Sequence, residues 1–191
     1  MTGLAQISNY CYDRYSCIEN YKTNGEKKYI DYLRDNDNNL SITALKMDNI
    51  DVDSFPLTQQ VSFSLNLTSS EKDYIIFNTN LFSSLKNNPF LSENRYSDVD
   101  FVHANNYNLI GIYKVPAGYK ADALPKNISL VMPDKSIICR RMIVEQDGNI
   151  TVRYTINYNR IIYNKDSYPE LQVFYKKMHE MLNEQVVLKK S

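Results

Sequence analysis

The hydrophobic period changes twice along this chain of 191 residues, and this change constrains the fold more than any other feature of the sequence. Apolar side chains recur every three or four residues over 11–33, every second residue over much of 40–158, and again every three or four residues over 171–182. The longer period is typical of helices and the shorter one of half-buried strands. We therefore predict an α+β fold: antiparallel β sheets in a sandwich-like arrangement, with two N-terminal helices and a long C-terminal helix.

The N-terminal region is predicted to hold two separate helices. Thr23 and Glu26 have capping-box spacing, so the second helix begins there. The run of Asp and Asn at 35–39 ends it, because these short side chains compete with the helix for main-chain hydrogen bonds. The apolar stripes are Cys11, Tyr15, Ile18 and Tyr21 in the first helix, and Tyr29, Ile30, Tyr32 and Leu33 in the second.

Two strands stand out in the region of period two. Residues 61–67 alternate cleanly, and residues 150–158 alternate after Asp147-Gly148, a favoured hairpin turn. Between these strands the chain is rich in Asn and Ser, and structureless runs of that length are rare inside a compact domain. We therefore predict an N-terminal α+β subdomain over 1–80, an irregular crossing segment over 81–106, and a C-terminal β subdomain with a closing helix over 107–191.

The last predicted helix has one apolar stripe, which must be buried against something. We expect it to pack on the sheet of this same chain. The stripe consists of Leu171, Phe174, Met178, Met181 and Leu182.

Composition excludes several classes of function. The 22 Lys and Arg side chains balance 22 Asp and Glu, so no basic excess is present to bind nucleic acid. No apolar run reaches the roughly 20 residues of a membrane span. The start has no charged and apolar leader of the kind that marks a signal peptide. Because strand-like sequence follows Met1 at once, we expect the chain to be a segment of a longer protein.

No catalytic or metal-binding pattern is convincing in the sequence. Cys11, Cys17 and Cys139 match no zinc spacing, and we expect reduced, buried thiols, with a bridge from either N-terminal cysteine to Cys139 left open. His103 is predicted to lie in a loop and His179 on a surface, so neither suggests a Cys–His pair. We predict no enzyme activity and no cofactor for this chain.

Acidic residues give no firmer site. The run at 35–39 resembles a calcium loop, but its sixth and twelfth positions hold Leu40 and Lys46 instead of Gly and Glu. No two carboxylates are placed by the sequence at a working distance for glycoside chemistry. The carboxylates that could be considered are Asp51, Glu93, Asp98 and Asp100.

Exposed tyrosines on a sheet could stack on sugars, so a carbohydrate-binding β domain with a glycan partner is our alternative prediction. The chain has 16 Tyr but no Trp. Tyr154 and Tyr158 share their strand face with Ile150, Val152 and Ile156, which indicates core packing for these two rings.

Three groups of short motifs, in this order, resemble the C-terminal region of bacterial transglutaminase-like proteins. The first group is Asn88-Pro89-Phe90 and Arg95 to Phe101, where Asp98 replaces a proline common in that family. The second is Val115-Pro116-Ala117-Gly118-Tyr119 with Ala123-Leu124-Pro125-Lys126. The third is Tyr168-Pro169-Glu170-Leu171, Phe174-Tyr175 and Glu184 to Lys190.

The resemblance implies a domain of unknown function that follows a papain-like Cys-His-Asp core in a longer envelope protein. It implies a periplasmic, cell-envelope or secreted location, and the core of the same longer chain as partner. None of the present residues matches the catalytic Cys, His or Asp of that core. We therefore predict a non-catalytic accessory or interaction module.

The same motif residues have structural interpretations of their own. Pro89 holds Asn88 in an extended conformation and Phe90 acts as an apolar anchor, as does Phe101. Arg95 is predicted to pair with Asp98 or Asp100. Pro116 and Gly118 are predicted to end a strand and to allow a turn with a positive φ. Tyr119 and Pro125 complete the set of structural motif residues.

Overall fold

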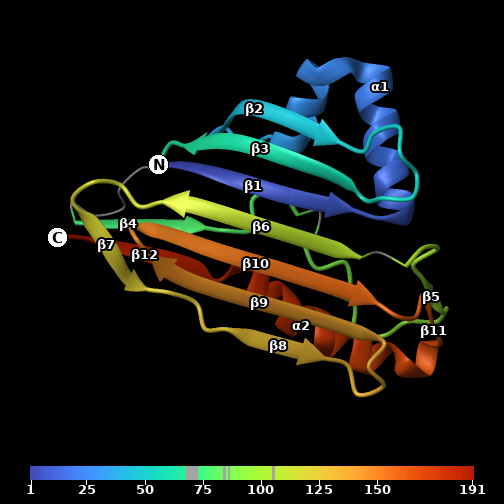
Figure 1. Cartoon of the computed structure of the whole chain (residues 1–191). Coiled ribbons are helices and arrows are strands. Elements are labelled where there is room, and N and C mark those ends of the chain that lie inside the picture. Colours follow the sequence, from blue (N-terminus) through green and yellow to red (C-terminus); the bar gives the residue numbers. More distant parts are fainter. Residues whose placement is uncertain (68–72, 84, 86, 105) are drawn as a thin grey trace.

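Seven antiparallel strands form the main sheet of the computed structural model, which describes residues 1–67, 73–83, 85, 87–104 and 106–191 (Figure 1). Their order is β2-β3-β1-β6-β10-β9-β8, so β1 joins strands from both halves of the chain by pairing with β3 and β6. The strands are β1 (Thr2–Asn9), β2 (Leu40–Asp48), β3 (Leu57–Leu65), β6 (Tyr107–Lys114), β8 (Ile128–Val131), β9 (Ile137–Gln146) and β10 (Asn149–Tyr158).

A smaller sheet packs against the main one. It has the order β4-β12-β7, with β4 (Tyr74–Asn78), β7 (Tyr119–Ala123) and β12 (Gln185–Lys190). The rings of Phe77 on β4 and Tyr113 on β6 are 5.5 Å apart, and the Tyr113 hydroxyl donates a 2.6 Å hydrogen bond to the Thr79 carbonyl. A further two-stranded pair joins β5 (Val99–Asp100) to β11 (Ile162–Tyr163). The predicted α+β class with antiparallel sheets is thus confirmed.

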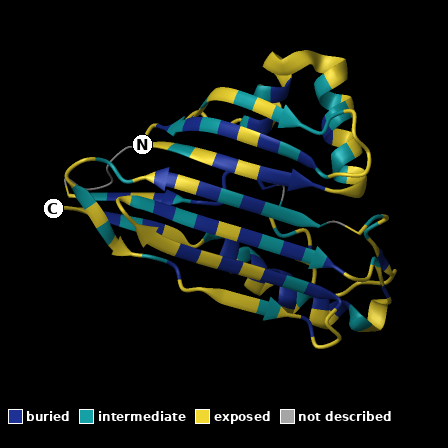
Figure 2. Cartoon of the chain, viewed as in Figure 1, coloured by how far each residue is buried: buried dark blue, intermediate teal, exposed yellow. Residues whose placement is uncertain are grey.

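The described helices and the smaller sheet cover one face of the main sheet and leave the other face open (Figure 1). Residues that pair across neighbouring strands lie on the same face, and alternate residues lie on the other. On the covered face one such row is buried, and its members are Val61, Ala5, Gly111, Val152 and Ile143. Figure 1 looks onto the opposite face, with α2 (Tyr168–Asn183) and the smaller sheet behind it, and Figure 2 shows the alternation of buried and exposed residues along each strand.

Helix α1 (Cys11–Arg34) contains both predicted N-terminal helices. Its backbone departs from helical geometry at Gly25, where φ is 77° and ψ is 166°, so two helical segments meet at a bend. Glycine adopts this conformation without the steric cost that other residues incur. The helix ends at Asp35, which is left-handed with φ 48°, and Tyr29 and Leu33 are buried. The polar run at 35–39 therefore ends a helix, as predicted.

Helix α2 buries the predicted apolar stripe on the chain's own sheet. Leu171, Phe174 and Met178 are among its buried residues, and the Tyr175 hydroxyl lies 2.7 Å from that of Tyr158 on β10. A short 3₁₀ turn, η1 (Lys165–Ser167), precedes the helix, and Pro169 lies in its first turn, where a proline costs no hydrogen bond. The helix is not the last element, because β12 follows it and pairs with β4 and β7.

The predicted division into subdomains over 1–80 and 107–191, with a crossing segment over 81–106, stays a prediction. Strands from both sides of those boundaries pair in the main sheet, as β1 does with β6. The intervening segment contains β5 in addition to its irregular parts. In the described part of the chain, neither helix has the length and apolarity required to cross a bilayer.

Replacement of Phe174 by alanine tests whether the burial of α2 stabilises the fold. Phe174 is 6% exposed, so we expect Phe174→Ala to lower the free energy of unfolding by about 3–5 kcal/mol, the range for emptying a core aromatic site. The neighbouring Val173 is 52% exposed, so Val173→Ala should change the free energy of unfolding by less than about 0.5 kcal/mol. Urea unfolding of both variants measures the difference. Equal stabilities would contradict the packing of α2 described above.

Candidate functional site

A polar cleft of about 410 Å³ lies between α1 and the β1–β3 part of the main sheet. Three side chains at its base form a hydrogen-bonded chain. The Tyr29 hydroxyl donates to Gln59 Oε1 at 2.9 Å, and Gln59 Nε2 donates to Asn9 Oδ1 at 2.7 Å. Gln59 is only 1% exposed, so its amide needs these partners. The network ties α1 to the sheet and occupies the amide groups of Gln59. Other polar side chains also line the cleft, among them Asp13, Ser16 and Tyr107.

The thiols have no features of nucleophiles. All three cysteines are free, and Cys11 is exposed, in contrast to the predicted buried state. Burial raises the pKa of Cys17 and raises that of Cys139 to about 12. A reactive thiol needs a lowered pKa, so these two surroundings favour packing over catalysis.

The two histidines lie in different surroundings. The ring of His103 stacks on Tyr12 with centroids 4.3 Å apart, and His179 lies half-buried on α2. Desolvation raises the pKa of the nearby Asp13 carboxyl, and the charge of His103 opposes that shift. Within the ranges that the structure describes, no three His, Cys, Asp or Glu side chains gather to hold a metal ion.

Phe90 and Phe101 lie in an aromatic cluster beneath the crossing segment. Phe90 packs edge-to-face on Tyr175 with centroids 4.6 Å apart and on Phe101 at 6.0 Å. The Asn88 Oδ1 atom accepts a 2.9 Å hydrogen bond from the Phe90 amide, which fixes the Asn-Pro-Phe turn. Pro89 is exposed at that turn. These residues join the crossing segment to α2.

Arg95 forms different contacts from the predicted ion pair. Its guanidinium donates to the main-chain carbonyls of Ser97 and Asp98, at 3.0 and 3.4 Å. The Asp98 carboxylate instead accepts from the Lys165 amide at 2.9 Å, and that of Asp100 from the Val102 amide at 2.7 Å. Both carboxylates accept from main-chain amides, that of Asp100 two residues along the chain and that of Asp98 at a separation of 67 residues.

The remaining motif residues form the turns around β7. The Tyr119 amide donates to the Pro116 carbonyl at 3.1 Å, and Gly118 has the predicted positive φ, of 82°. Tyr119 begins β7 and pairs with Lys190, and Pro125 is buried after β7 ends. The motif residues at the crossing segment and those around β7 therefore occupy separate structural positions.

The exposed tyrosines lie outside the main sheet. Tyr154 and Tyr158 on β10 are 0% and 7% exposed, so core packing explains both. Burial raises the pKa of Tyr158 to about 12, against the lowering effect of its hydrogen bond with Tyr175. The well-exposed rings lie on α1 and in the crossing segment, and include Tyr12, Tyr15, Tyr32 and Tyr96.

The uncovered face of the main sheet carries apolar side chains in adjacent positions. Leu4 on β1 pairs with Ile112 on β6, and Thr151 on β10 pairs with both Ile112 and Val144 on β9. Leu4 is 55% exposed and Val144 54%, and Met142 on the same face of β9 is 61% exposed. We name Leu4, Ile112, Met142 and Val144 the open-face patch. The sequence signal for it was weak, because along each single strand these residues share the outward face with polar residues such as Gln6, Lys114 and Arg140.

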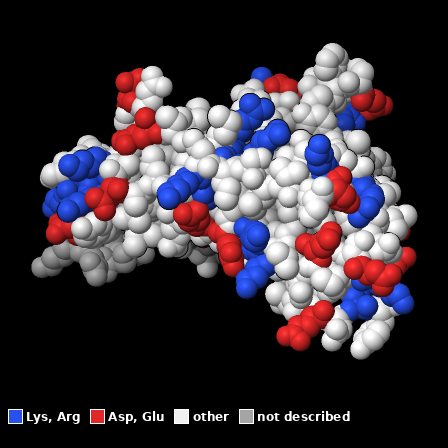
Figure 3. Space-filling model, turned by 90° about the horizontal axis from the view of Figure 1, so that it is seen from below, with Lys and Arg blue, Asp and Glu red and all other residues white. Residues whose placement is uncertain are grey.

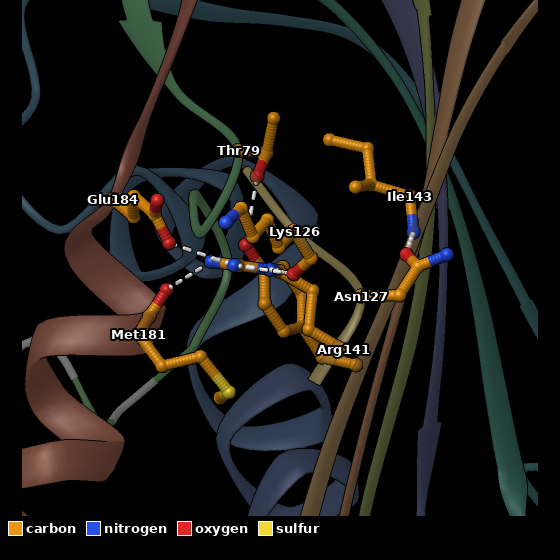
Figure 4. Close-up of polar contacts among 8 residues, drawn as sticks. Thr79, Lys126, Asn127, Arg141, Ile143, Met181 and Glu184 are labelled. Atoms are coloured by element: carbon orange, nitrogen blue, oxygen red, sulfur yellow. Dashed lines mark hydrogen bonds and ion pairs between the residues drawn. The ribbon is translucent and has the colours of Figure 1, made fainter. Parts of the chain in front are cut away.

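Arg141 on β9 is a buried charge on the opposite face, with its side chain 2% exposed. Its guanidinium donates to the Lys126 carbonyl at 2.7 Å, to the Met181 carbonyl at 2.6 Å and to the Glu184 carboxylate at 2.7 Å (Figure 4). These partners come from the segment before β8, from the last turn of α2 and from the residue before β12. Sequence reasoning missed this contact, although Arg141 alternates with the apolar Cys139 and Ile143.

Thiol titration tests the described environments of the cysteines. In the native protein we expect one of the three thiols, Cys11, to react with a disulfide reagent near pH 8, and all three after denaturation. Burial keeps Cys17 and Cys139 protonated and out of contact with the reagent. The Cys11→Ser variant supplies the control and should show almost no native reaction. Rapid native reaction of a second thiol would contradict the structure.

Three comparisons with known proteins complete the description of the chain. No curated protein matches it. A crystal structure from Parabacteroides distasonis ATCC 8503, described as a "putative protease", shares the fold with a TM-score of 0.53 at 12% identity. That likeness covers 63% of this chain and 24% of the other, so the chain spans about a quarter of that protein. A family model described as a domain of unknown function with a solved structure (DUF3858) matches residues 73–188, and the chain therefore belongs to that family.

Proposed function

We propose that this chain is a non-catalytic interaction module that accompanies a transglutaminase- or protease-like core in a longer bacterial envelope protein. The open-face patch is the observation that carries the proposal. Antiparallel sheets often leave one face to water, but that face is then polar. Four large apolar side chains in neighbouring positions on such a face suit contact with another protein surface.

The chemistry of the described side chains favours binding over catalysis. The two buried thiols have raised pKa values, and the His103 ring is occupied by its stack on Tyr12. In the cleft beneath α1, Gln59 bonds both Tyr29 and Asn9. A nucleophile would need an adjacent base and a third orienting group, and the side chains described above do not supply that set.

The fold likeness supports the proposal that this chain accompanies another domain in a longer protein. A structure in which this fold makes up 24% of a longer chain leaves room for further domains. The transglutaminase-like link, the envelope location and the intramolecular partner rest on the sequence resemblance, and we carry them forward as parts of the proposal. The carbohydrate alternative would now have to use the exposed tyrosines of α1, such as Tyr12 and Tyr15.

Oxidation of Met142 tests the proposed docking face. In the isolated chain this side chain is 61% exposed and should oxidise readily in dilute peroxide. In the natural longer protein, contact with the core should slow formation of its sulfoxide roughly fivefold or more, because oxidation follows exposure. Peptide mass spectrometry measures the rate at this one residue.

Tyr96 supplies the internal control, since it is 93% exposed and lies outside the open-face patch. Its labelling by hydroxyl radicals should be the same in the isolated chain and the longer protein. Equal oxidation of Met142 in both would contradict docking through this face. Glycan binding that is lost in Tyr12→Ala or Tyr15→Ala would favour the carbohydrate alternative. Peptide hydrolysis or transamidation by the isolated chain would contradict a non-catalytic role.

A further inference from the structure

Strand β8 ends the main sheet, and its outer main-chain edge pairs with no other strand among the residues that the structure describes. It pairs on one side with β9, and the Met132 amide donates to the Ile137 carbonyl at 3.0 Å. In an antiparallel pair, hydrogen-bonded and non-hydrogen-bonded positions alternate. The main-chain groups of Leu130 therefore face β9 like those of Met132, whereas the N–H and C=O groups of Ser129 and Val131 point away from the sheet.

Strand β8 is short, with four residues, but it lacks the other devices by which proteins protect exposed strands. Charges, prolines and bulges are the usual protection. Strand β2, at the other end of the same sheet, has a register shift between Ile42 and Ala44, and it carries Lys46 and Asp48. Strand β8 has the sequence Ile-Ser-Leu-Val and pairs in unbroken register. Strand β2 therefore carries features that oppose pairing with another chain, whereas β8 has neither a charge nor a bulge. We call the outer edge of β8 the receptive edge.

A groove of about 560 Å³ runs beside the receptive edge, between β8 and α2. Val131 on β8 is 47% exposed and Val173 on α2 is 52% exposed, so both can contact an incoming chain. A second hollow of about 410 Å³ shares Leu130 and Lys177 with the groove and extends it toward Glu184. The apolar lining of the groove is Leu130, Val131, Pro133, Pro169, Val173 and Phe174.

We propose that this groove binds an extended polypeptide segment, which adds to β8 as a further antiparallel or parallel strand. The unpaired groups of Ser129 and Val131 would receive its main-chain hydrogen bonds, and alternate side chains would enter the groove. This mode of recognition takes affinity from the main chain and specificity from the side-chain pockets. The four residues of β8 match about four ligand residues, or roughly 13 Å of strand. The site is separate from the open-face patch.

The charges at the groove define the ligand further. Glu170 and Lys177 line the groove, and Glu180 and Glu184 line its extension. The Glu184 carboxylate is paired with Arg141, but Glu170 and Glu180 still outnumber the ammonium group of Lys177. Figure 3 views the molecule from the β8 side and shows charges of both signs scattered over a largely uncharged surface. The favoured ligand is therefore an extended segment with apolar residues at alternate positions and Lys or Arg at its ends. A second copy of this chain fits less well, because symmetric pairing of β8 would bring like carboxylates together.

A synthetic peptide tests the proposal directly. The probe is the blocked, dye-labelled peptide Lys-Thr-Val-Thr-Val-Thr-Lys, titrated against the whole chain by fluorescence anisotropy and by NMR. We expect saturable binding with a Kd in roughly the micromolar to millimolar range. The amide signals of Ser129 and Val131 should shift and exchange more slowly with solvent. The same peptide N-methylated at alternate residues should not bind, because it cannot form the strand ladder.

Two variants of the protein separate the main-chain and groove contributions. Ser129→Pro removes an outward N–H group without removing a hydrogen bond to β9. Val173→Lys places in the groove a positive charge that repels the lysines of the peptide. Each variant should weaken peptide binding at least about tenfold. Val52→Lys makes the matched exchange in the β2–β3 connection and should bind as the parent does. Thermal melts of all three check that they are folded.

Three results would overturn the proposal. They are the absence of saturable binding at millimolar peptide, equal binding by the N-methylated peptide, and a dimer of the free chain that Ser129→Pro dissociates. The last would identify a second copy as the occupant of the edge. Because none of these measurements involves the open-face patch, the strand-binding site can fail while the docking proposal stands, and the reverse also holds.

Discussion

The arrangement of the C-terminal half depends on the burial of the Arg141 guanidinium. Arginine does not lose its charge in proteins, and its donors all need acceptors once water is removed. Main-chain carbonyls of Lys126 and Met181 and the carboxylate of Glu184 supply them. One side chain on β9 thereby fixes the start of β8, the end of α2 and the start of β12. The Met181 carbonyl lies in the last helical turn, where carbonyls lack helical partners and a cation is favoured.

Both proposed surfaces follow from this arrangement. The groove keeps its width because Arg141 anchors the chain before β8 and the last turn of α2 to the same strand. Thr79 connects the smaller sheet to the main one, since its hydroxyl lies 2.8 Å from that of Tyr154 and its carbonyl accepts from Tyr113. With the helices and the smaller sheet held on one face, the opposite face stays bare.

Local patterns in the sequence predicted the elements, but not how they combine. Alternation identified β3 and β10, and the apolar stripe identified α2, because these patterns depend on nearest neighbours. The pairing of β1 with β6 joins residues about a hundred positions apart, and no local pattern encodes it. Strand β12 was missed because the helix was expected to end the fold, although Val186 and Leu188 alternate. Arg141 was missed because arginine is seldom fully buried.

The central claim is that Arg141 acts mainly by holding main-chain carbonyls, with the ion pair to Glu184 secondary. Urea unfolding of Arg141→Met and Glu184→Gln tests it. Glu184 is 52% exposed, so Glu184→Gln should lower the free energy of unfolding by only about 0–1 kcal/mol. Arg141→Met leaves the buried carbonyls unsatisfied and should lower it by about 2–5 kcal/mol. The claim would be contradicted if Arg141→Met were as stable as the parent, or if both variants lost the same free energy of unfolding.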